Sequence, residues 1–115
     1  MATIWQQAEE LKDEMVERRR DLHRHPETGW TEFRTASMII GELKKLGYDV
    51  KFGADVIDEK SMMGVPSEAE LADYMQRAIS EGADPELVKQ MAGGKTGIVA
   101  TLKTDKPGKT VAFRF

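Results

Sequence analysis

Apolar and polar residues repeat with helical spacing over the first two dozen positions. The apolar residues of this stretch are Ile4, Ala8, Leu11, Met15 and Leu22. Intervals of three, four and seven residues place them on one side of a helix. Thr3 is suited to cap the amino terminus of this helix, and Pro26 disfavours helical geometry at His25. We therefore predict a helix from about Ile4 to Arg24.

A second amphipathic pattern begins near Thr31. Its predicted buried stripe consists of Phe33, Ala36, Ile39, Ile40, Leu43 and Leu46. Residues 25–30 separate the two helices and read as a turn, in which Gly29 can take a positive φ. Gly47 is placed to end the second helix. Residues 48–52 then alternate side chains between two faces, which predicts a β-strand.

Residues 54–94 differ in character and are predicted to form a helical insertion between strands. Ser67 and Glu70 are spaced as a capping box, which marks the start of a helix. That helix carries Leu71, Met75, Ala78 and Ile79 on one face. Asp84 and Pro85 open a second, shorter helix, because proline is favoured at the first helical position.

The chain closes with two segments that read as strands, residues 96–103 and 109–115. Pro107 and Gly108 lie between them where a type II turn favours these residues, so we expect a hairpin. The second strand is apolar and nothing in the sequence follows to cover it. A finished domain seldom ends on an open strand, so we expect an amino-terminal piece of a larger protein.

These elements predict an α/β fold in which two long helices pack on a small mixed, mostly antiparallel sheet. The 115 residues, 40% apolar and 32% charged, suit a single globular domain spanning residues 1–115. The net charge of −3 provides no broad basic field for nucleic acid or anionic lipid. No apolar run reaches the length of a membrane span. The absence of cysteine excludes disulfides and thiolate ligands within this sequence and favours a cytoplasmic location.

The only two histidines, His23 and His25, are candidate metal ligands together with Glu27. Side chains two residues apart on a helix point in different directions, and a zinc site needs three or four protein ligands. We favour a structural role at the carboxyl end of the first helix, where histidines can satisfy carbonyl groups. Arg18 is expected to pair with Glu14 on a solvated helix face rather than to bind nucleic acid.

Glycines at positions 93, 94 and 97 around Lys95 superficially suggest a phosphate-binding loop. The spacing differs from that of such loops, and a strand rather than a helix is predicted to follow. Backbone freedom is the more common reason for glycines that lead into a strand. From the residues alone, no catalytic and no metal-binding set can be assigned, and substrate-binding residues stay unknown.

Two ordered blocks, residues 19–36 and 94–115, resemble the amino-terminal part of the metal-dependent amidohydrolases of the aminoacylase, hippurate hydrolase and carboxypeptidase group. The segment Met63–Pro66 and the ending Ala112–Phe115 are most similar to the p-aminobenzoyl-glutamate hydrolase subgroup. The resemblance implies a catalytic domain with a sheet flanked by helices, a smaller domain that commonly mediates dimerisation, and two divalent metals, usually zinc or manganese. It also implies hydrolysis of N-acyl or N-aroyl amino acids by a metal-activated water and a general-base glutamate.

In that family the metal ligands and the general base lie beyond the segment that matches residues 109–115. The resemblance therefore transfers no catalytic or metal residue to this sequence. We expect a partial catalytic domain, part of an enzyme that cleaves amides such as p-aminobenzoyl-glutamate, and inactive by itself. The alternative is a non-catalytic interaction module that self-associates through the open strand 109–115.

Overall fold

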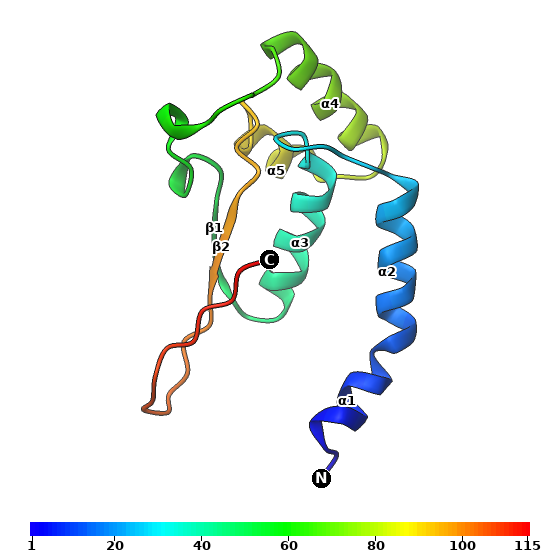
Figure 1. Cartoon of the computed structure of the whole chain (residues 1–115), viewed down its shortest axis with the longest axis vertical. Coiled ribbons are helices and arrows are strands. Elements are labelled where there is room, and N and C mark those ends of the chain that lie inside the picture. The colour runs from blue at the N-terminus through cyan, green and yellow to red at the C-terminus, as the bar shows by residue number, and fades with distance from the viewer.

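Helices dominate the computed structural model, which describes all of residues 1–115 (Figure 1). The elements in chain order are α1 (Ile4–Glu10), α2 (Lys12–Arg24), α3 (Phe33–Lys45), β1 (Asp49–Phe52), the 3₁₀ turns η1 (Gly53–Asp55) and η2 (Glu59–Ser61), α4 (Glu68–Ser80), α5 (Pro85–Gln90) and β2 (Ile98–Thr101). The predicted α/β fold with a small antiparallel sheet is confirmed. None of the helices is both long and apolar enough to cross a membrane.

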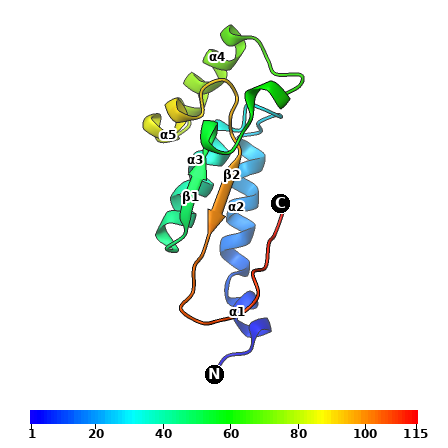
Figure 2. The same ribbon diagram turned by 90° about the vertical axis from the view of Figure 1, so that its left-hand side faces the viewer.

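The sheet consists of β1 and β2 alone, paired antiparallel from Asp49 opposite Thr101 to Phe52 opposite Ile98. A two-stranded sheet is marginally stable without further packing. Here Val50, Phe52 and Ile98 pack against the buried core, which supplies that support. Figures 1 and 2 show α3 running beside the two strands along their length.

The core lies where α3, α4 and α5 meet. Its buried apolar residues are Phe33, Ala36, Ile40, Leu71, Ala78, Ala83, Val88 and Met91. The first three belong to α3, and the other five come from the segment between the strands. Residues 54–94, between the two strands, therefore supply more of the core residues than α3 does.

The residues predicted to start α4 and α5 form the expected caps. Ser67 Oγ accepts a hydrogen bond from the Glu70 N–H at 3.3 Å, and Glu70 Oε2 accepts one from the Ser67 N–H at 2.9 Å. The hydrogen bonds that Ser67 donates to the Glu70 carboxyl lower its pKa, because they favour its charged form. Pro85 occupies the start of α5, and the Asp84 side chain caps it by accepting from the Glu86 N–H at 2.9 Å.

The first predicted helix is divided in two at Leu11, where the backbone N–H turns to the Ala8 carbonyl at 3.2 Å. We refer to α1 and α2 together as the arm. No residue of the arm is buried. The predicted stripe of α3 is also narrower than expected, since Ile39 and Leu46 are exposed. The elements packed on α3 cover only the side that carries its three core residues.

Two ion pairs attach α2 to the rest of the molecule. The Asp21 carboxylate accepts from both terminal nitrogens of Arg34, at 2.8 and 3.1 Å, and Arg18 donates to Glu42 at 3.0 Å. Arg34 Nε also donates to the Glu81 carbonyl at 3.0 Å, so one guanidinium joins α2, α3 and the end of α4. The hydrogen bonds from Arg34 hold the pKa of Asp21 below its ordinary value.

The predicted terminal hairpin is wrong. β2 pairs with β1 instead, and residues 109–115 form no strand and no backbone hydrogen bond. Residues 102–115 are exposed throughout. A strand is stabilised when one of its faces is covered. Because no element packs over Val111, Phe113 or Phe115, pairing the tail would bury little apolar surface.

Replacing Phe33 by alanine tests the position of the core. The side chain is fully buried, so we expect Phe33→Ala to lower the free energy of unfolding by about 3–5 kcal/mol. Phe113→Ala is the matched control and should change it by no more than about 0.5 kcal/mol, because Phe113 is exposed. Urea unfolding followed by circular dichroism measures both. Equal losses in the two variants would contradict a core centred on α3.

Acid should weaken the attachment of α2. The pKa of Asp21 is lowered in the folded state, so its contribution to stability is full above the ordinary pKa of about 3.9. It is lost as the pH falls through the lowered pKa. Asp21→Asn should therefore lose less stability than the wild type between pH 6 and pH 3 in urea titrations. Thr104→Ser, which changes an exposed side chain that carries no charge, should keep the wild-type pH dependence.

Candidate functional site

The residues that the sequence singles out lie in the segment between α2 and α3. His23 is exposed, whereas His25 is partly buried and its Nδ1 lies 2.9 Å from the Asp21 carbonyl oxygen. This contact agrees with the expected structural role at the end of a helix. Because a carbonyl oxygen can only accept, Nδ1 is the donor in this contact.

The Glu27 side chain binds the amino terminus of α3 instead of the histidines. Its Oε1 accepts from the Arg34 N–H at 2.7 Å and its Oε2 from the Thr35 N–H at 2.9 Å. The first N–H groups of a helix have no partner within the helix, and a negative charge suits that end of its dipole. Glu27 therefore acts as a helix cap from outside the helix. Glu27 precedes the two residues that it caps by seven and eight positions. Known capping patterns span only about three residues, so the sequence gives no signal for this role.

These residues do not fit the metal pair that the family resemblance implies. No group of three histidine, cysteine, aspartate or glutamate side chains lies close enough together to hold an ion. The carboxylates closest to the histidines in sequence are also occupied, Asp21 by Arg34 and Glu27 by backbone N–H groups. No step of metal chemistry can be derived for the residues of this chain.

Backbone strain is concentrated at Trp30, where φ is +69°. The sequence favours Gly29 for the positive φ, and this expectation is wrong. A bulky side chain is rare in this conformation, which is held only when its surroundings determine it. Trp30 Nε1 donates to the Met63 carbonyl at 2.9 Å, so the ring fastens the segment before α4.

The glycine-rich segment packs against the same turn. Gly94 has a φ of +77°, and a Cβ there would lie 2.9 Å from the Trp30 carbonyl oxygen. Glycine is therefore required both by conformation and by space. Lys95 pairs with Glu59 at 3.0 Å, and Thr96 donates to Glu32 at 2.8 Å. The segment leads into β2, so its glycines provide close backbone packing instead of a phosphate-binding loop.

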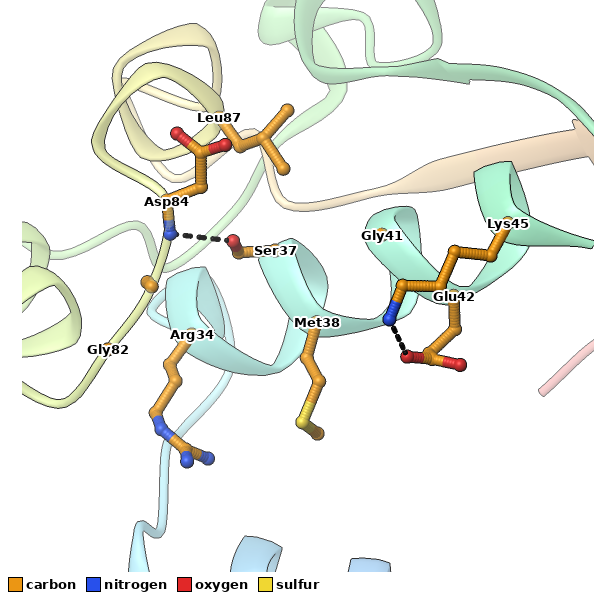
Figure 3. Close-up of a pocket in the computed structure, with 10 residues that line it drawn as sticks. Arg34, Ser37, Met38, Gly41, Glu42, Lys45, Gly82, Asp84 and Leu87 are labelled. Atoms are coloured by element: carbon orange, nitrogen blue, oxygen red, sulfur yellow. Dashed lines mark hydrogen bonds and ion pairs between the residues drawn. The ribbon is translucent and has the colours of Figure 1, made fainter.

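A shallow hollow of about 280 Å³ lies between α3 and the turn that joins α4 to α5 (Figure 3). Its lining residues are Arg34, Ser37, Met38, Gly41, Glu42, Lys45, Gly82, Ala83, Asp84 and Leu87. The Asp84 N–H donates to Ser37 Oγ at 3.1 Å across the hollow. Lys45 and Arg18 both bind Glu42 and lower the pKa of its carboxyl.

The charged groups of this hollow are all engaged. Lys45 binds Glu42, Arg34 binds Asp21, and the Asp84 side chain caps α5. Ser37 Oγ accepts from a backbone N–H and has no histidine beside it to act as a base. The hollow therefore presents neither an activated nucleophile nor an acid–base pair.

The comparisons with known proteins are consistent in sequence and in structure. The chain is 50% identical over 105 residues to indole-3-acetyl-aspartic acid hydrolase of Enterobacter agglomerans, covering 91% of this chain and 24% of that protein. It is 42% identical over 114 residues to the A-subunit of p-aminobenzoyl-glutamate hydrolase from Escherichia coli K12, covering 99% of this chain and 26% of that protein. No protein-family model matches the sequence.

The crystal structure of an aminobenzoyl-glutamate utilization protein from Klebsiella pneumoniae has the same arrangement, with a TM-score of 0.88 at 43% identity. The match covers 93% of this chain and 27% of that one. The chain thus spans about a quarter of the length of the relatives it matches. The predicted resemblance to the A-subunit of p-aminobenzoyl-glutamate hydrolase is confirmed, and the chain is homologous to about a quarter of these hydrolases.

Proposed function

We propose that this chain is the amino-terminal part of the catalytic domain of a metal-dependent amidohydrolase, with residues 54–94 as a helical insertion. The observation that supports this is the joint match in sequence and fold to the Klebsiella pneumoniae protein. An identity of 42–50% over nearly the whole chain supports descent from the same enzymes. The Escherichia coli relative is named as one subunit of its enzyme, which supports a parent enzyme built from more than one chain.

The proposed substrates follow from the names of two relatives. One hydrolyses indole-3-acetyl-aspartic acid and the other p-aminobenzoyl-glutamate. Both compounds join an aromatic acid to a dicarboxylic amino acid through an amide bond. We therefore propose that the parent enzyme cleaves N-acyl or N-aroyl derivatives of acidic amino acids.

The chain contributes structure to this activity, not the reacting groups. A divalent metal, zinc or manganese, would supply an activated water in such an enzyme. Asp21 and Glu27, the acidic residues closest in sequence to the two histidines, are used here to attach helices. The strained Trp30 turn and the Arg34 ion pair instead fix how α2, α3 and α4 meet. The chain by itself should be inactive.

The activity of the isolated chain is the direct test. Purified chain supplied with zinc or manganese and p-aminobenzoyl-glutamate should release no p-aminobenzoate above a blank with metal alone, as measured by liquid chromatography. The full-length Escherichia coli relative serves as the positive control for the assay. Hydrolysis that elutes with the 12.9 kDa chain during size separation would contradict the proposal.

A second candidate function is self-association through the carboxyl-terminal tail. Val111, Phe113 and Phe115 alternate along the tail and are 70%, 78% and 112% exposed. Phe113 and Phe115 stack on one another with ring centroids 6.3 Å apart. β2 is paired on one side only, so its other edge could accept the tail of a second copy.

Analytical ultracentrifugation over a range of concentrations tests this second candidate. Self-association predicts that the average mass rises with concentration. Replacing both Phe113 and Phe115 by serine should then lower the association constant by about tenfold or more, because the apolar contact is lost. Replacing Thr104 by serine is the control and should change nothing. A constant mass of 12.9 kDa at high concentration would contradict self-association.

A further inference from the structure

One side of the arm is apolar and uncovered. Its residues, which we call the arm stripe, are Ile4, Leu11, Met15 and Leu22, with exposed fractions of 83%, 52%, 62% and 37%. At about 100° per residue, the last three lie within about 60° of Arg18, which binds Glu42 on α3. The arm stripe therefore faces the space beside α3 and not the outer side of the molecule.

The carboxyl-terminal tail, residues 102–115, is uncovered in the same way. Its apolar side chains Val111, Phe113 and Phe115 are exposed, and none of its charged side chains forms an ion pair. Figures 1 and 2 show the tail turning back at the level of α1 and then running in the same direction as the arm. In Figure 1 the end of the tail lies between the sheet and α2, so it is on the same side of α2 as α3.

The apolar side chains of the tail and of the arm stripe have similar spacing. Alternate side chains of an extended segment repeat about every 6.6 Å, and residues four apart on a helix repeat about every 6 Å. Val111 to Phe115 would then span about 13 Å, and Leu11 to Leu22 about 17 Å. An extended tail can therefore place its three apolar side chains along the arm stripe without a gap.

The two segments also carry opposite charge. Residues 4–17 contain five acidic side chains and one basic side chain, whereas residues 102–115 contain four basic side chains and one acidic side chain. Opposite charges attract over about 8–10 Å at moderate salt, so this difference favours contact between the arm and the tail. The arm of a second copy carries the same negative charge in its first half and lacks this attraction.

We propose that the tail is a strap that closes on the arm stripe of its own chain, and that the structure shows the strap open. Because the tail and the arm belong to one chain, closure has an effective concentration on the order of mM, which favours it over contact with a second copy. Closure covers the same side chains that the second candidate function offers to another copy, so the closed strap opposes self-association. The strap does not depend on the proposed hydrolase activity.

Disulfide formation within one chain tests the strap, because the sequence has no cysteine of its own. Met15→Cys combined with Phe113→Cys places one thiol on the arm stripe and one on the tail. Asp13→Cys combined with Phe113→Cys is the matched control, because Asp13 lies on the opposite side of α2. Each double variant is oxidised at low micromolar concentration, and the linked peptides of the monomer fraction are measured by mass spectrometry.

The bond between positions 15 and 113 should form about tenfold faster or more than the bond between positions 13 and 113, at a rate independent of protein concentration. Equal rates for the two pairs would overturn the proposal, as would a bond between positions 15 and 113 that forms only between two copies. Neither the arm nor the tail contributes a buried residue, so all variants should keep the wild-type urea midpoint.

A second measurement leaves the apolar side chains of the tail in place. Met15→Cys is labelled with a maleimide in the otherwise unchanged chain and in a chain that also carries Phe113→Ser and Phe115→Ser. The thiol should react about threefold more slowly or less in the unchanged chain, because the closed strap protects it. Asp13→Cys should react at one rate in both backgrounds. Equal rates for position 15 in the two backgrounds would reject the strap.

Discussion

Helix α3 packs against α4, α5 and the sheet, and this contact organises the molecule. Phe33, Ile40 and their neighbours on α3 meet α4 and α5 in a core that excludes water. The same core supports β1 and β2, which as two strands would be marginal alone. Burial of this face is the main favourable contribution to folding. Without it, neither the sheet nor the short helices would hold their positions.

Polar contacts then orient the arm relative to this core. Arg34 binds the Asp21 carboxylate and the Glu81 carbonyl, and Glu27 caps the helix that carries Arg34. Such bonds are directional, so they set how α2 approaches α3, but they cover little apolar surface. The arm is thus well oriented and poorly covered.

The residues of the candidate site also belong to the polar contacts that orient the helices. Acidic residues and histidines near the α2–α3 connection suggest metal chemistry only by their type. In the folded chain, their oxygen and nitrogen atoms bind backbone groups and Arg34, so they serve the joint between helices. The relationship to amide hydrolases rests on the ordered blocks of sequence and on the matching fold. It does not rest on a set of catalytic residues in the chain.

Features that depend on near neighbours could be predicted from the amino-acid sequence. The caps at Ser67 and Asp84, the strand before Gly53 and the amphipathic face of α3 all follow from residues within a few positions of one another. Long-range contacts settle the other features. β2 pairs with β1 across more than forty residues, Trp30 takes the positive φ because distant Met63 and Gly94 hold it, and the tail stays unpaired because nothing covers it. Local patterns show which residues favour burial, but whether a partner surface lies opposite them is a property of the whole fold.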